Sequence, residues 1–152
     1  MTVFLIRHAE AGQRGGGSGP DELRELDDAG RRQADGMVRL LATERVDRVL
    51  SSWYPRCRQT VEPLAAARRL SVEEDEGLAE GADPRALVAR MGDLDHSALS
   101  SHGDVISGVI VELDEAGVPL DGALRWKKAS TWALEVRGGK VVSGRYLPPP
   151  PG

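Results

Sequence analysis

Val3-Phe4-Leu5-Ile6-Arg7-His8 is the stretch of sequence that decides the fold. Its first four residues form an unbroken apolar run, without the alternation expected of a strand that has one wet face. Such a run is typical of a parallel strand covered by helices on both sides. The run ends at a cation and an imidazole. The sequence therefore predicts a buried central strand with polar side chains at its carboxyl end.

Two later segments repeat this order of apolar run, polar stop and helical pattern. Residues 46–50 lead into residues 51–55, where Ser52 is the expected cap and Pro55 suits the first turn of a helix. Residues 98–101 lead into His102 and then a further helix. After the first strand we expect a Gly-rich loop over 12–20 and a helix from Asp27 or Asp28 to about residue 43.

The remaining segments complete an α/β pattern. An acidic connector covers 73–80, a short helix 84–91, and a hairpin 130–146 that turns at Gly138-Gly139. We expect a three-layer sandwich with a mostly parallel central sheet, helices on both faces and the C-terminal hairpin at the edge. Residues 1–147 are predicted to form a single domain, and 148–152 a Pro-rich tail.

Composition and charge exclude several classes of protein. The chain has 152 residues, 40% of them hydrophobic, and a formal net charge of −4, so it lacks the basic footprint of a nucleic-acid binder. Cys57 is the only cysteine, which excludes a disulfide within the chain and a cysteine-based zinc site. The apolar N-terminal run is too short for a signal peptide or a membrane span. We therefore expect a cytoplasmic protein that binds neither nucleic acid nor membrane.

The strand ends carry the residues of a phosphate site. In sheets of this kind ligands bind beyond the carboxyl ends of the strands, where the sequence places Arg7, His8, Arg56 and His102. Arginine forks match phosphate oxygens, and the amides after His102 open a helix whose N-terminus attracts anions. A neutral imidazole can attack phosphorus, and a second one can stabilise the charge of the transition state.

These motifs resemble the histidine phosphatase superfamily, the phosphoglycerate-mutase-like proteins. Arg7-His8-Ala9-Glu10 is similar to its Arg-His-Gly signature, residues 51–60 to Ser-Ser-x-x-x-Arg-x-x-Gln-Thr, and residues 101–106 to its third motif. Residues 26–34 resemble the start of its first helix. Ala9 in place of Gly resembles the small phosphohistidine phosphatase branch. The first loop also resembles the phosphatase-like domain attached to some actinobacterial Nudix hydrolases.

The resemblance implies roles for individual residues. His8 would be the nucleophile that becomes phosphohistidine, and Arg7, Arg56 and His102 would hold the phosphoryl oxygens. Glu80 matches the place of the family's proton donor, although it ends an acidic run typical of a solvated surface. Its pKa would have to be raised by burial for that role at neutral pH. No metal and no cofactor are implied.

Three further residues are candidates for substrate binding. Arg14 lies in the loop after His8 and could reach a second phosphate, Gly103 supplies an amide at the start of a helix, and Lys128 precedes the hairpin. Solvation is the commoner explanation for Arg14, and packing or solubility explains Lys128 equally well. Cys57 beside Arg56 is more often a packing residue than a nucleophile.

The sequence thus predicts a metal-independent phosphatase that acts through a phosphohistidine on His8. The predicted substrate is a phosphohistidine protein or a small phosphomonoester. The short chain has no room for a large cap, and an open site suits a protein-bound phosphohistidine or a bulky substrate. Two alternatives stay open. The same site could hydrolyse nucleoside di- or triphosphates, with Trp53, Trp126 or a tyrosine stacking on the base, or the chain could be a catalytically silent module that binds phosphate or phosphoproteins.

Overall fold

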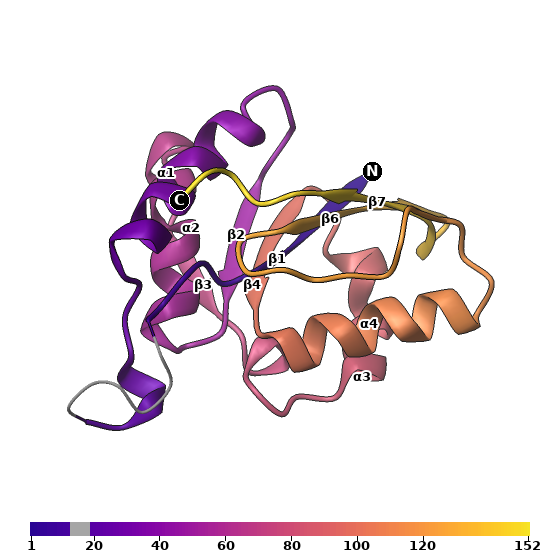
Figure 1. Cartoon of the computed structure of the whole chain (residues 1–152). Helices are drawn as coiled ribbons and strands as arrows, with labels where there is room; N and C mark the ends of the chain where they lie inside the picture. Colours follow the sequence, from indigo (N-terminus) through magenta and orange to yellow (C-terminus); the bar gives the residue numbers. More distant parts are fainter. Residues whose placement is uncertain (13–18) are drawn as a thin grey trace.

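The computed structural model describes residues 1–12 and 19–152 as a seven-stranded sheet between two layers of helices (Figure 1). The predicted three-layer α/β sandwich is confirmed. In chain order, the longer elements are β1 (Thr2–Arg7), α1 (Asp28–Leu40), β2 (Arg48–Ser51), α2 (Pro55–Ala67), β3 (Val72–Glu74), α3 (Pro84–Arg90), β4 (Ser97–Ser101), α4 (Gly103–Glu115), β5 (Leu120–Asp121), β6 (Thr131–Arg137) and β7 (Lys140–Leu147). Three-residue 3₁₀ turns lie at Asp21–Leu23, Glu76–Leu78 and Met91–Asp93.

The sheet is mixed and mostly parallel, with the strand order β3-β2-β4-β1-β6-β7-β5. Strands β1 to β4 are mutually parallel, whereas β6 runs antiparallel to both β1 and β7. The helices that follow the adjacent strands β1 and β4 go to opposite faces, α1 to one and α4 to the other (Figure 1). The carboxyl ends of β1 and β4 therefore form a switch point, where sheets of this type bind ligands.

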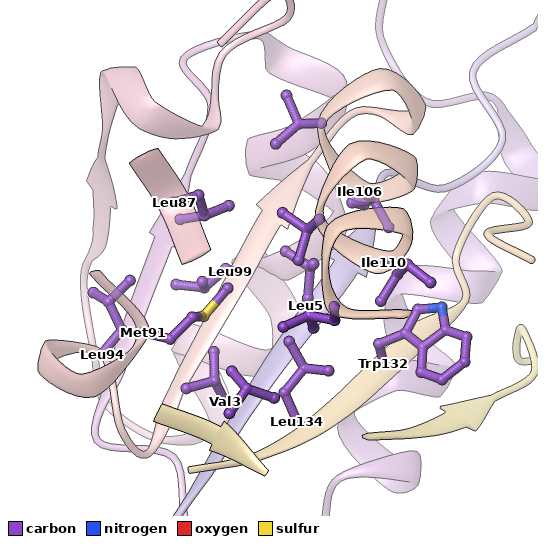
Figure 2. Close-up of a cluster of buried hydrophobic side chains, with 14 of the residues drawn as sticks. Val3, Leu5, Leu87, Met91, Leu94, Leu99, Ile106, Ile110, Trp132 and Leu134 are labelled. Carbon is purple, nitrogen blue, oxygen red and sulfur yellow. The ribbon is translucent and has the colours of Figure 1, made fainter. Parts of the chain in front are cut away.

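The apolar run of β1 supplies both cores of the molecule. Phe4 and Ile6 point into the cluster formed with α1 and α2, and Val3 and Leu5 into the one formed with α3 and α4. Figure 2 shows this second cluster, in which Ile106 and Ile110 of α4 lie over the sheet. Because all four side chains are almost fully buried, the strand has no wet face, as its unbroken hydrophobicity predicted.

Several boundaries differ from the expectation. The first helix begins after Asp27, whose side chain accepts a hydrogen bond from Gly30 N–H, but it ends at Leu40 rather than near residue 43. Ser52 does not cap α2. The residue at the N-cap position is Tyr54, and its side chain makes no capping hydrogen bond. The hairpin has the predicted strands and turn, with positive φ at Gly138 and Gly139. It is not quite at the edge, because β5 pairs with the far side of β7.

The Pro-rich tail lies against the domain rather than away from it. Pro150 is buried, and a Cβ built on Gly36 of α1 would lie 2.6 Å from the Pro150 Cβ. Figure 1 shows the C-terminus beside α1. Among the residues that the structure describes, no helix is both long and apolar enough to cross a membrane.

Candidate active site

The register of the central strands brings the polar strand ends together. Arg7 at the end of β1 pairs with Ser101 at the end of β4, and His8 N–H donates to Ser101 O at 3.0 Å. The residues that follow, His8 and His102, are therefore neighbours, with ring centroids 5.7 Å apart. On the other side of β4, Ser52 N–H donates to Ser100 O at 3.0 Å. Three strand ends thus meet, as the sequence predicted.

His8 is held as a neutral imidazole. Burial lowers its pKa to about 3, the hydrogen bond to Ala9 O opposes this shift, and the charge of nearby Arg56 lowers the pKa further. Nδ1 lies 2.8 Å from Ala9 O, an acceptor, so this nitrogen carries the proton. Nε2 then keeps its lone pair, and His8 lines the cavity at the strand ends. The side chain has the protonation state that a nucleophile needs.

His102 is also neutral, and the segment after β2 holds its ring. Burial is the main cause that lowers its pKa to about 4, with Arg56 adding to the shift. Nε2 lies 2.9 Å from Ser52 Oγ, which itself accepts from Tyr54 N–H at 3.3 Å. The Ser52 hydroxyl has a proton and a second lone pair, so this contact fixes the position of the His102 ring for either tautomer.

Arg7 and Arg56 each bury a donor that has no partner. The Nε atoms of both are buried without a hydrogen-bond acceptor in the described structure, and burial of a cationic donor without an acceptor is costly. Arg7 Nη1 donates to Trp126 O at 2.9 Å, and Arg56 Nη1 to Asp21 O at 2.8 Å. Arg56 Nη2 also lies 3.3 Å from Asp21 Oδ2. The N–H groups that these bonds leave open fit an anion, because guanidinium N–H groups match the oxygens of phosphate.

The N-terminus of α4 borders the same site. Its first residue is Gly103, and a Cβ there would lie 2.9 Å from Arg7 Cζ, so only glycine lets this guanidinium lie across the start of the helix. The residue before it, His102, provides no side-chain cap. The first amides of α4 are therefore open to an anion.

A cavity of about 670 Å³ joins these groups, a size within the usual range for small-molecule sites. Of the predicted site residues, it is lined by Arg7, His8, Arg56, Glu80, His102, Gly103 and Lys128. Arg14 lies outside the described residues. Glu80 is exposed, so the burial that the sequence analysis required of the proton donor is absent in the unliganded structure. The carboxylate does lie near Tyr54, whose pKa is raised chiefly by burial and further by Glu80.

The structure adds residues that the motifs did not indicate. Arg24, Asp104, Ser107, Trp126 and Gly12 also line the cavity. Arg24 follows a 3₁₀ turn whose position depends on tertiary contacts, so no local pattern in the sequence singles it out. Trp126 was predicted only as a surface for a nucleotide base.

Cys57 is not placed as a nucleophile. Its thiol is fully buried, burial raises its pKa to about 12, and it packs 3.4 Å from His102 Nε2. A neutral, inaccessible thiol is a packing group. Within the described part of the chain, no cluster of three or more His, Cys, Asp or Glu residues is placed to hold a metal ion.

The arrangement combines a neutral imidazole, two buried guanidinium groups and a helix N-terminus, a combination suited to phosphoryl transfer. The profile of the histidine phosphatase superfamily (branch 1) matches residues 3–82, more than half of the chain. The chain belongs to this superfamily. This match confirms the phosphatase chemistry that the motifs predicted, as the activity of the family. Membership of a family of enzymes disfavours the interpretation of this chain as a catalytically silent binding module.

A curated relative of this histidine phosphatase is the 8-oxo-(d)GTP phosphatase of Mycolicibacterium smegmatis, 32% identical over 156 aligned residues. The alignment covers 98% of the chain but 48% of the relative. The chain thus spans about half the length of that protein. The expected likeness to a domain within a longer nucleotide-hydrolysing protein is consistent with this match.

Solved structures share the fold at low sequence identity. The protein histidine phosphatase SixA, solved with tungstate, is 20% identical, with a TM-score of 0.74 over 99% of this chain and 97% of that one. The mycobacterial glucosyl-3-phosphoglycerate phosphatase Rv2419c is 17% identical, with a TM-score of 0.65 over 95% and 96%. The names of these proteins indicate unlike substrates, so the shared fold does not identify the substrate of this chain.

Proposed function

We propose that this histidine phosphatase hydrolyses its substrate in two steps through a covalent phosphohistidine on His8, without a metal ion. The observation that carries the proposal is the hydrogen bond from His8 Nδ1 to Ala9 O, which leaves Nε2 unprotonated in a cavity lined by Arg7, Arg56 and His102. The cytoplasmic location expected from the sequence stays a prediction.

In the first step, the Nε2 lone pair attacks phosphorus, the P–N bond forms and the bond to the leaving group breaks. Arg7, Arg56, His102 and the first amides of α4 stabilise the negative charge on the phosphoryl oxygens. Glu80 lines the same cavity; it is exposed in the unliganded site, but a bound substrate would cover it, and it then protonates the leaving group. In the second step, Glu80 accepts a proton from water as the water attacks phosphorus, the P–N bond breaks and orthophosphate leaves.

The substrate classes consistent with this site are a small phosphomonoester and a protein-bound phosphohistidine. A second candidate is a nucleoside di- or triphosphate, favoured by the match to the 8-oxo-(d)GTP phosphatase over almost the whole chain. Trp126, which lines the cavity, would then be the aromatic side chain nearest a bound base.

The test is turnover of p-nitrophenyl phosphate, a phosphohistidine peptide and a nucleotide panel in the presence of EDTA. His8→Ala should lower turnover by roughly 10³-fold or more, because the covalent route is lost. His96→Ala is the matched control, since His96 does not line the cavity. An alkaline quench after mixing with labelled substrate should trap label on the wild-type protein that acid removes. Full activity of His8→Ala, or activity abolished by EDTA, contradicts the proposal.

Glu80→Gln separates the role of the acid from that of the nucleophile. If Glu80 protonates the leaving group, the variant should lose activity towards alkyl phosphates, which are poor leaving groups, and keep most of its activity towards p-nitrophenyl phosphate. Equal loss on both substrates would indicate that Glu80 acts in binding or in the water step instead. Binding of orthophosphate with no turnover of any substrate would restore the binding-module interpretation.

A further inference from the structure

Two cations line the cavity in addition to the arginines placed on the transferred phosphoryl group. They are Arg24, which follows the 3₁₀ turn Asp21–Leu23, and Lys128, which precedes β6. Among the described residues that line the cavity, four are Lys or Arg and two, Glu80 and Asp104, are acidic. Asp21 pairs with Arg24 and Glu10 with Lys128, so net charge alone does not define the ligand, and the donors that these pairs leave open do.

Arg24 is fixed in place but keeps donors available. Its Nη1 donates to Ala11 O at 2.9 Å and to Gly12 O at 3.1 Å, which ties it to the segment that follows His8. Its Nε donates to Asp21 Oδ1 at 3.1 Å, and its side chain is only 16% exposed. For Nη2 the described residues provide no hydrogen-bond acceptor. A preorganised guanidinium with free donors in a cavity is suited to hold an oxyanion.

Arg24 is a close neighbour of Arg56, because the two share one carboxylate. Asp21 Oδ1 accepts from Arg24 Nε at 3.1 Å, and Asp21 Oδ2 lies 3.3 Å from Arg56 Nη2. Two guanidinium groups joined through a single carboxylate are near enough to contact adjacent phosphates of one ligand. Lys128 is held less tightly: its Nζ lies 3.8 Å from Glu10 Oε2, and both side chains are partly exposed.

We propose that Arg24, assisted by Lys128, binds a second phosphate joined to the transferred one, so that the preferred substrates contain a phosphoanhydride. This inference rests on the proposed function and narrows it. Arg56 and Arg7 hold the phosphoryl group that moves to His8, and Arg24 holds the phosphate that leaves with the rest of the substrate. A phosphohistidine or a simple monoester leaves Arg24 without a ligand.

The first experiment compares inhibition constants of orthophosphate and pyrophosphate, measured against p-nitrophenyl phosphate. Wild type should bind pyrophosphate more tightly than orthophosphate. Arg24→Gln should weaken the binding of pyrophosphate about tenfold to a hundredfold, the loss expected for charge-assisted hydrogen bonds. It should change the inhibition constant of orthophosphate by no more than about twofold. The matched control is Arg58→Gln, which also breaks an arginine–carboxylate pair, with Glu74 at 3.2 Å, outside the cavity.

Lys128→Met provides a second test, because Arg24→Gln also removes the bonds to Ala11 and Gly12. Lys128→Met should weaken the binding of pyrophosphate several-fold and leave the binding of orthophosphate unchanged. Equal weakening of both anions by Arg24→Gln, or no effect of Lys128→Met on pyrophosphate, overturns the inference. Calorimetry measures the binding of both anions without turnover, so the second-phosphate site can be tested even if the protein hydrolyses nothing. The second-phosphate site can therefore fail this test while the phosphohistidine mechanism stands.

Discussion

The side chain of His8 is buried among cations, and this environment determines its protonation. Desolvation and the charge of Arg56 both disfavour imidazolium, so the pKa is lowered to about 3, and that of His102 to about 4. Both rings should therefore stay neutral at every pH from about 5 upwards. Because the pKa of each ring in the unfolded chain is about 6.5, their contribution to stability is present above pH 6.5. As the pH falls below 6.5 this contribution decreases; that of His102 is lost by about pH 4 and that of His8 by about pH 3.

We expect ¹⁵N NMR of the imidazole nitrogens to show His8 neutral and protonated on Nδ1 between pH 7.5 and 5. His102 should also be neutral, with its ring held by the contact with Ser52 Oγ. Ser52→Ala removes the hydroxyl at 2.9 Å from His102 Nε2, so it should change the His102 signals and leave those of His8 in place. A midpoint near pH 6.5 for His8 would contradict this account of the nucleophile, and His8→Asn assigns the signal.

At the level of elements, α1 positions the segment that follows His8. A Cβ on Gly30 would lie 1.9 Å from Glu10 O, and this carbonyl also accepts from Asp27 N–H at 3.0 Å. A backbone atom cannot move aside as a side chain can. Gly30→Ala should therefore cost about 1–3 kcal/mol of stability and lower kcat by shifting His8 and its neighbours.

Gly36→Ala is the matched control on the same helix, because its Cβ would meet Pro150 in the C-terminal tail. The nearest atoms that this Cβ would meet belong to a proline side chain rather than to backbone, and alanine is favoured over glycine in a helix by up to about 1 kcal/mol. This variant should keep its activity and lose little stability. Thermal unfolding and p-nitrophenyl phosphate turnover check both variants, and equal loss of activity in the two would contradict the role assigned to Gly30.

Sequence patterns predicted elements with long, strong signals and missed those set by tertiary pairing. The buried run of β1 and the polar residues after β1, β2 and β4 were predicted because hydrophobicity and strand-end chemistry are local features. Strand β3, with Glu73 and Glu74, was predicted as an acidic connector, since its only strand-like property is pairing with β2. Arg24 was missed for the same reason: its place beside Arg56 depends on Asp21, which the local sequence does not indicate.

At the scale of the whole molecule, the sheet separates the two main cores, and the candidate phosphate site lies where three strands end. The tail contributes on one side only. Pro150 packs on Gly36, and a Cβ on Gly152 would lie 3.2 Å from the Ala29 Cβ, so both contacts are with α1, whose residues do not line the cavity. The predicted catalytic domain, residues 1–147, should therefore fold and act without the tail.

Deletion of residues 148–152 should leave kcat and KM unchanged and lower the free energy of unfolding by about 1 kcal/mol, the scale of one buried apolar side chain. For a domain of this size the unfolding midpoint would fall by about 2–4 °C. If the tail acts through its contact with Gly36, the deletion and Gly36→Ala share one interaction, and their effects on stability should not add. Additive effects would mean that the tail stabilises the domain elsewhere, and a loss of turnover would mean that the catalytic unit extends beyond residue 147.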